Sequence, residues 1–241
     1  MPQRAAIVTG ASRGIGRAIA ETLAEEGYAL TIAARKPATL EETAAALRAK
    51  GHMVVAQAAN MNDEDAIKAV VALHRETYGR LDALVNSAGL GIGAAAGEHQ
   101  TKFIDMQFDV NIRAIILFYR ECLEMLRAAG AEHKQALVIN LSSLAGKSPQ
   151  PWLSVYAATK AAVLGYTVAM NKELLGDGIK SVAFCPGFVD TDMSEFVKES
   201  VPAEEMITTA DIAEGVRFLL RLSPACVIPE IIFERPGEAA L

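Results

Sequence analysis

Two kinds of apolar pattern alternate along the chain: short continuous runs, and longer segments in which apolar positions recur with a helical period. Continuous runs are typical of strands buried on both faces, and a helical period predicts helices that cover a sheet. Their alternation predicts an α/β fold, doubly wound around a mainly parallel sheet with helices on both faces. Seven strands are expected, at Ala5–Thr9, Leu30–Ala34, Val54–Ala58, Ala83–Asn86, Ala136–Leu141, Val182–Phe184 and Ile231–Phe233.

Six helices are expected between those strands, at Ile15–Glu26, Thr39–Lys50, Asp63–Tyr78, Thr101–Ala129, Ser154–Leu175 and Asp211–Leu222. Thr39 with Glu42 predicts a capping box on the second helix, and Thr208 or Thr209 is expected to cap the last one. No linker separates two apolar patterns, so residues 1–241 are assigned to a single domain.

Composition excludes several classes of protein. A net charge of −6 without a basic cluster argues against nucleic-acid binding, and no apolar run approaches the roughly 18 residues of a membrane span. The N-terminal residues show no secretory signal pattern. The three cysteines form no C-x-x-C pair and the four histidines share no spacing, so no metal site is expected and a reducing, cytoplasmic location is predicted.

The first expected strand runs directly into the glycine-rich stretch TGASRGIG at 9–16. Gly10, Gly14 and Gly16 allow a tight turn, a close approach of backbone to a pyrophosphate, and a helix N-terminus that faces the phosphates. An ordinary strand-to-helix turn can carry the same glycines. The first strand–helix junction of a doubly wound sheet is, however, where dinucleotides bind, which favours the phosphate site.

The charge at the end of the second strand bears on which dinucleotide would bind. NAD enzymes carry a carboxylate there for the ribose 2′-hydroxyl, whereas this chain has Arg35 and Lys36. A guanidinium holds a 2′-phosphate bidentately, and Arg13 and Ser12 of the glycine loop are expected to approach the same group. The pattern favours NADP(H); the alternative is that Arg35 and Lys36 are solvated loop cations.

Tyr156 is followed four residues later by Lys160 on an expected helix, so the two side chains are neighbours. A tyrosine titrates near ~10, and a nearby cation lowers that pKa by ~1 to 3 units, which would make the pair an acid/base at neutral pH. An ordinary helix surface contact is the alternative. Ser143 ends a strand thirteen residues before Tyr156 and is the candidate hydroxyl beside it, with Ser142 as its rival.

Taken together, these motifs resemble the short-chain dehydrogenase/reductase family along nearly the whole chain, with a β-ketoacyl reductase-like branch as the closest. The resemblance implies a Rossmann-type fold that interconverts a carbonyl compound and a secondary alcohol with NADP(H). It also implies a small-molecule substrate and a homodimer or homotetramer. The matching stretches are TGASRGIG at 9–16, NSAG at 86–89, DVNIRA with Asn111, Ser143, Tyr156 with Lys160, and PGFVDT at 186–191.

The resemblance also implies a role for each matched residue. Tyr156 would donate the proton to the carbonyl oxygen, Ser143 would hydrogen-bond that oxygen, and Lys160 would hold the nicotinamide ribose and lower the Tyr156 pKa. Asn111 would support a water in a proton relay, or else be a buried polar group bonded to backbone. The implied cofactor-binding residues are Gly10, Ser12, Arg13, Gly14, Ile15, Gly16, Arg35, Asn60, Met61, Asn86, Ala88, Gly89, Tyr156, Lys160, Pro186, Gly187, Val189 and Thr191.

Some features leave alternatives open. Trp152 either walls the substrate pocket or anchors its loop, and residues 190–206 are expected to form a substrate lid or, alternatively, a surface helix. Asn60 stands where relatives usually have aspartate, and Asn86 is also expected to tie neighbouring strands. A non-catalytic NADP(H)-binding regulatory protein and a nucleotide-sugar epimerase remain as other functions, and the motif set favours the reductase over both.

Overall fold

The computed structural model describes residues 4–237, so residues 1–3 and 238–241 of the expected domain lie outside it. Its seven strands form one sheet in the order β3-β2-β1-β4-β5-β6-β7, and every pairing between them is parallel. The α/β expectation is therefore confirmed, and the predicted strand ends differ by at most a few residues. The strands are β1 Arg4–Thr9, β2 Tyr28–Ala34, β3 Val54–Ala58, β4 Ala83–Asn86, β5 Ala136–Leu141, β6 Ile179–Pro186 and β7 Glu230–Phe233.

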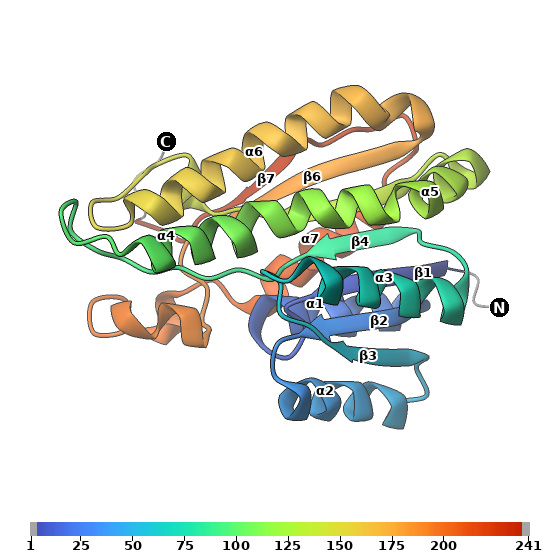
Figure 1. The fold of residues 1–241 in the computed structure, drawn as a ribbon, viewed down its shortest axis with the longest axis horizontal. Helices are drawn as coiled ribbons and strands as arrows, with labels where there is room; N and C mark the ends of the chain where they lie inside the picture. Colours follow the sequence, from blue (N-terminus) through green and yellow to red (C-terminus); the bar gives the residue numbers. More distant parts are fainter. Residues whose placement is uncertain (1–3, 238–241) are drawn as a thin grey trace.

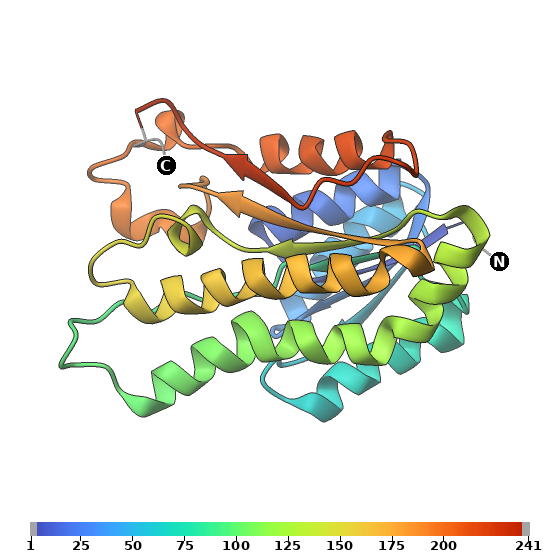
Figure 2. The same cartoon turned by 90° about the horizontal axis from the view of Figure 1, so that it is seen from above.

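The helices cover both faces of the sheet (Figures 1 and 2). Those named α1, α2 and α7 lie on one face, and α3 to α6 lie on the other. Strand residues alternate between the two layers, so that Val8 packs with the first group and Ile7 with the second. The bounds are α1 Gly14–Glu25, α2 Pro37–Ala49, α3 Glu64–Tyr78, α4 Thr101–Phe108, α5 Ala114–His133, α6 Ser154–Leu174 and α7 Thr209–Leu220.

Two expectations about helix starts had different outcomes. Thr208 caps α7 in a capping box with Asp211, as expected for that position. The capping box of Thr39 with Glu42 is wrong, because α2 already begins at Pro37. Proline at the first helical position has its φ preset for a helix and needs no partner for an N–H, so the helix starts before the threonine.

The single long helix expected over Thr101–Ala129 is divided. One π-helical turn, Asp109–Arg113, separates α4 from α5, and α5 continues to His133. A π turn inserts one residue into the helical repeat and redirects the side chains on that turn. Asn111 lies in this turn, so the irregularity falls on a predicted site residue.

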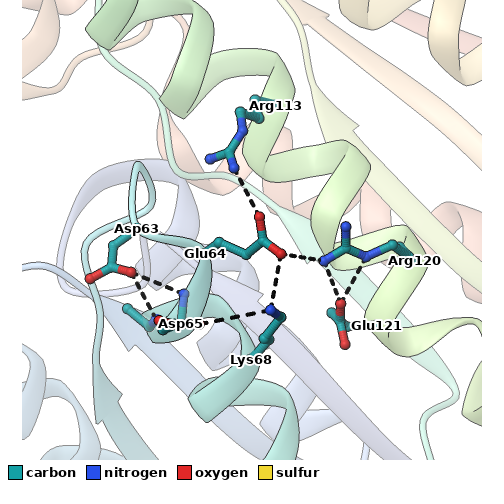
Figure 3. A network of polar contacts seen from close by, with 8 residues as sticks. Asp63, Glu64, Asp65, Lys68, Arg113, Arg120 and Glu121 are labelled. Carbon is teal, nitrogen blue, oxygen red and sulfur yellow. Dashed lines mark hydrogen bonds and ion pairs between the residues drawn. The ribbon is translucent and has the colours of Figure 1, made fainter.

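Glu64 at the start of α3 joins this π turn to the neighbouring helix (Figure 3). Its carboxylate accepts hydrogen bonds from Arg113 at 2.9 Å and Arg120 at 2.8 Å, and it pairs with Lys68 at 3.0 Å. The hydrogen bonds with Arg120 and, next, Lys68 lower the pKa of Glu64 to about 2. The network therefore holds α3 against the turn that carries Asn111.

The order of the strands determines where a ligand site can form. The chain reverses its direction of growth between β1 and β4, and crevices open at such a switch point beyond the carboxyl ends of the strands. The loops that follow β1, β4, β5 and β6 gather at that end (left in Figure 1). Within residues 4–237, no helix is long and apolar enough to cross a membrane, and no group of three metal-ligating side chains comes together.

Candidate active site

A cleft of about 860 Å³ opens at the carboxyl ends of the strands. It brings together residues from the glycine loop, the ends of β2, β4, β5 and β6, and α6. All predicted site residues except Asn86 and Asn111 line it. Those that do are Gly10, Ser12, Arg13, Gly14, Ile15, Gly16, Arg35, Asn60, Met61, Ala88, Gly89, Ser143, Tyr156, Lys160, Pro186, Gly187, Val189 and Thr191.

The glycine loop leaves room for a bound group against the backbone. Gly10 has a φ of +68°, and a Cβ there would lie 2.9 Å from the Ala88 nitrogen. A Cβ on Gly16 would overlap the Gly10 carbonyl oxygen. No side chain caps the first turn of α1, so the N–H groups of that turn are not used by a side-chain cap. The N-terminus of a helix stabilises an anion placed against such groups. This cradle fits the pyrophosphate of a dinucleotide.

Thr9, which the sequence analysis did not single out, ties the glycine loop to the turn after β4. Its hydroxyl oxygen accepts from the N–H groups of Ser87 and Ala88, each at 3.1 Å. Asn86 is buried below that turn and donates to the Asn140 side chain at 2.8 Å, linking β4 to β5. The expected strand tie is thus present. Asn86 does not line the cleft, and its expected contact with the cofactor stays a prediction.

The phenol of Tyr156 and the amine of Lys160 lie one helical turn apart on α6. The Lys160 Nζ lies 5.6 Å from the centroid of the Tyr156 ring and donates to the Leu141 carbonyl oxygen at 2.7 Å. On the other side of the phenol, a Cβ on Gly91 would lie 3.3 Å from the Tyr156 ring. Tyr156 is therefore held between α6 and the loop after β4.

The pKa of Tyr156 lies above its ordinary value in this structure, opposite to the direction expected from Lys160 alone. Burial raises the pKa of Tyr156, and a hydrogen bond with Ser143 only partly offsets that effect. Burial also lowers the pKa of Lys160 to about 8. Spacing brings the two groups together, but burial disfavours the charged form of each, and for Tyr156 this desolvation is the largest effect on its pKa.

The two serines of the candidate pair are in different situations. Ser142 is buried and its hydroxyl donates to the Lys160 carbonyl oxygen at 2.8 Å. Ser143 caps a short 3-10 turn by accepting from the Ala145 N–H at 3.1 Å, and it makes the hydrogen bond with Tyr156 noted above. Ser143 therefore shares the phenol's side of the cleft, whereas Ser142 fixes the backbone of α6.

Asn111 lies in the interior, not on the cleft wall. Its Oδ1 accepts from the Leu90 N–H at 2.9 Å, and its Nδ2 donates to the Leu90 carbonyl oxygen at 2.8 Å and to the Thr159 hydroxyl at 3.0 Å. Both amide hydrogens are thus used, as in the alternative of a buried polar group bonded to backbone. Thr159 was missed by the sequence analysis, since it belongs to no motif.

Arg13 reaches across the cleft to the loop after β6. Its guanidinium pairs with Asp192, and both side chains are 70% exposed. The sequence predicts a phosphate contact for Arg13 and no role for Asp192, because no spacing rule connects residues so far apart. The ion pair bridges the two rims of the cleft.

Residues 190–206 form a loop whose two ends lie together. The loop carries two short 3-10 turns, Asp192–Val197 and Ala203–Glu205, and not the α-helix of the alternative expectation. A parallel bridge joins Val189 to Ile207, with the Asp190 N–H donating to the Ile207 oxygen at 2.9 Å. The segment stands beside the cleft (orange in Figure 1), and residues 192–194 line it.

Comparison with known proteins places this site in context. A family model described as short chain dehydrogenase matches residues 4–202. The 3-oxoacyl-[acyl-carrier-protein] reductase of Staphylococcus aureus is 34% identical over 226 residues, covering 90% of each chain.

Two solved structures cover the chain almost completely. An alcohol dehydrogenase from Thermococcus sibiricus, complexed with 5-hydroxy-NADP, superposes with a TM-score of 0.87 at 28% identity, covering 99% of this chain and 98% of that one. A 3-ketoacyl-(acyl-carrier-protein) reductase from Brucella melitensis, complexed with NADH, gives a TM-score of 0.87 at 27% identity, covering 98% of each.

Proposed function

Because the chain belongs to the short-chain dehydrogenase family, we propose that it interconverts a carbonyl compound and a secondary alcohol with NADP(H), using Tyr156 as the acid and base. The observation that carries the proposal is the meeting of Tyr156, Ser143 and Lys160 in one cleft with the glycine loop. Each group alone has an ordinary structural explanation. Their convergence on one cavity is what an oxidoreductase site requires.

The residues of the cleft divide the chemistry of reduction among them. A bound reduced dinucleotide supplies the hydride to the carbonyl carbon. Tyr156 donates its phenolic proton to the carbonyl oxygen, and Ser143 donates a hydrogen bond to that oxygen as negative charge develops on it. The raised pKa of Tyr156 keeps the phenol protonated at neutral pH, which is the state that reduction uses.

Lys160 and Asn111 position the cofactor and the loop around Tyr156. We assign Lys160 to the ribose of the cofactor, since its amine lies between the Tyr156 ring and the Leu141 carbonyl. Asn111 fixes the backbone of Leu90, and the next residue, Gly91, lies against the Tyr156 ring. Asn111 is thus a positioning residue in this proposal.

Arg35 supports NADP(H) as the preferred cofactor. It follows the last residue of β2, lines the cleft and is exposed, so its guanidinium is free to grip a 2′-phosphate. The structural neighbours described above were solved with an NADP derivative in one case and NADH in the other. The charge at the end of β2 therefore decides the preference in this proposal.

The decisive experiment is the oxidation of NADPH by the purified protein over a panel of ketones and aldehydes, with NADH in parallel. We expect turnover with NADPH, a lower kcat/KM with NADH, and loss of turnover in Tyr156→Phe. Tight NADPH binding without turnover of any carbonyl compound would instead favour the regulatory alternative. NADH as the better cofactor would refute the role of Arg35.

Assembly and closure are further parts of the proposal. Ile116 on α5 and Val168 on α6 are each 42% exposed, and the two helices lie side by side on one face (Figure 2). We assign this apolar face to a homodimer, or to one interface of a homotetramer, measurable by light scattering. Residues 190–206 act as the substrate lid, because their pinned ends let the loop move as a unit over the cleft.

A further inference from the structure

Three aromatic side chains, Trp152, Phe188 and Phe196, form a cluster next to the cleft. Phe188 lies between Gly187 and Val189, which line the cleft, whereas Trp152 lines a neighbouring cavity of about 410 Å³. The Trp152 and Phe196 ring centroids are 5.9 Å apart, and those of Phe188 and Phe196 are 6.5 Å apart. Trp152 lies in the loop before α6, whereas the two phenylalanines lie after β6 and in the 190–206 segment. The aromatic cluster therefore joins the loop before α6 to the segment that follows β6.

The aromatic cluster adjoins the phenol of Tyr156. Gly91 and Gly93 are alternate residues of the loop after β4, and each has an aromatic ring in place of a side chain of its own. A Cβ on Gly91 would contact the Tyr156 ring, and a Cβ on Gly93 would overlap the Trp152 ring. One short stretch of backbone thus lies against both the Tyr156 and the Trp152 rings.

Trp152 is held in an unfavourable backbone conformation. Its φ of +71° lies in the left-handed region, which bulky side chains rarely adopt. The Ala94 N–H donates to the Trp152 carbonyl oxygen at 2.9 Å and fixes the residue there. Even so, Trp152 is 51% exposed and Phe196 is 57% exposed. Strain and exposed apolar area at one point are typical of a binding surface.

The charge around the aromatic cluster is negative. Residues 190–206 contain six carboxylates and one lysine. That lysine, Lys198, pairs with Asp190 and Glu195, and Arg13 pairs with Asp192. A polyanionic substrate, such as a thioester of coenzyme A or of an acidic carrier protein, would meet carboxylates at this rim.

We infer that the substrate is an uncharged ketone, or its secondary alcohol, whose carbonyl carbon bears an aromatic ring that packs against Trp152 and Phe196. The inference rests on the proposed function and names its substrate class. The ring would cover the exposed faces of both side chains, while the oxygen reaches Tyr156 and Ser143. Burial and ring packing both favour this arrangement.

Direct binding to a protein carrying Tyr156→Phe, which the proposed function makes unable to oxidise an alcohol, tests the inference without turnover. Trp152 is the single tryptophan of the chain, so its fluorescence reports on this surface alone. We expect 1-phenylethanol to change that fluorescence in a saturable way with NADP⁺ present, and 2-butanol to need about tenfold higher concentration. Phe196→Ala and Gly93→Ala, whose methyl displaces the Trp152 ring, should each weaken 1-phenylethanol binding about tenfold. Gly97→Ala, with no atom near its Cβ, is the matched control and should bind normally.

Kinetics then separate this inference from the proposed function. We expect kcat/KM with NADPH to be at least about tenfold higher for acetophenone than for 2-butanone or acetoacetyl-CoA, and the preference to fall in Trp152→Ala. The exposed Phe218→Ala on α7 should keep the preference. Acetoacetyl-CoA as the best substrate, or unchanged fluorescence with every aryl ligand, overturns the inference while NADPH oxidation upholds the reductase. Aryl binding with the expected variant pattern but no turnover upholds the aromatic site and overturns the reductase.

Discussion

The side-chain amide of Asn111 brackets the backbone of Leu90, accepting from its N–H at 2.9 Å and donating to its carbonyl oxygen at 2.8 Å. Two elements distant in sequence, the π turn of α4–α5 and the loop after β4, are joined by this one side chain. That loop carries Gly89, which lines the cleft, and Gly91, which packs on Tyr156. The geometry of the site thus depends on a residue outside the cleft.

Asn111→Ala should lower both stability and cofactor affinity. The substitution leaves the half-buried N–H and carbonyl of Leu90 without their partner, and a buried group left unsatisfied costs about 1–3 kcal/mol at most. We expect a fall of about 2 kcal/mol or more in the free energy of unfolding, measured by urea denaturation, and a weaker Kd for NADPH. Thr159→Val removes one of the three hydrogen bonds of Asn111, together with the bond from the Thr159 hydroxyl to the Tyr156 carbonyl oxygen, and leaves Leu90 bonded, so it should have a smaller effect on NADPH affinity. An unchanged NADPH Kd in Asn111→Ala would contradict the positioning role.

Tyr156→Phe should abolish proton transfer without disturbing the fold. Loss of a general acid lowers kcat by about 10² to 10⁴-fold, and the phenyl ring retains its packing against Gly91. We expect NADPH binding to stay within about twofold of wild type, since the ring and Lys160 remain. Tyr166→Phe on the same helix is the matched control, and its kcat should be unaffected. Equal losses in the two variants would argue against Tyr156 as the acid.

Arg35→Gln should change the cofactor preference and leave the chemistry intact. Removing a bidentate guanidinium from a phosphate is expected to reduce kcat/KM for NADPH by about 10 to 100-fold, with little change for NADH. Lys36→Gln next to it tests whether charge alone is responsible. If both variants lose NADPH preference equally, the effect is electrostatic and not a specific grip by Arg35.

Lys160 should make stability depend on alkaline pH. Its folded pKa of about 8 lies below the ordinary value of 10.5, so between these values the unfolded chain binds more protons than the folded one. The free energy of unfolding contributed by Lys160 therefore rises as pH increases from about 8 to about 10.5. In Lys160→Met this increment should disappear, as measured by urea denaturation at both ends of the window. An identical pH dependence in the two proteins would show that Lys160 is not desolvated.

Glu64 should protect the fold against acid. Its pKa is lowered from 4.5 to about 2, so its stabilising contribution is complete above 4.5 and is lost as pH falls toward about 2. Wild type should therefore lose more stability than Glu64→Gln over this range, in thermal unfolding followed at low ionic strength. Glu42→Gln, an exposed carboxylate of α2, should follow the wild-type curve. If Glu64→Gln does so too, the contacts in Figure 3 do not stabilise the protein.

Local patterns in the sequence were enough for most of the architecture and for the cleft. Strand and helix positions follow from apolar periodicity, and the glycine loop and Tyr156 with Lys160 follow from motifs within one or two elements. The π turn was not predictable, because an inserted residue leaves the apolar pattern of Thr101–Ala129 almost unchanged. The start of α2 was missed because Pro37 outweighs the capping signal of Thr39.

Properties that depend on burial or on distant contacts were beyond the sequence. The i, i+4 spacing places Lys160 near Tyr156, but the direction of the Tyr156 pKa depends on how much water the fold removes from both groups. Likewise, nothing in the motif containing Asn86 shows that its side chain faces Asn140 inside the sheet layer. The contact of Trp152 with Phe196 joins two irregular loops, for which periodicity carries no information.

The bridge between Val189 and Ile207 separates what must stay constant in this protein from what is free to diverge. Because the two strand-like ends are already fastened to each other, lengthening or rewriting the intervening residues adds little loop-closure entropy and transmits no displacement to β6. If this segment acts as the proposed lid, mutations at 195–206 should alter which molecule is accepted, whereas residues 190–194 line the cleft and include Thr191, which is assigned to the cofactor. Substrate preference in such a scaffold can therefore change when this one segment is replaced.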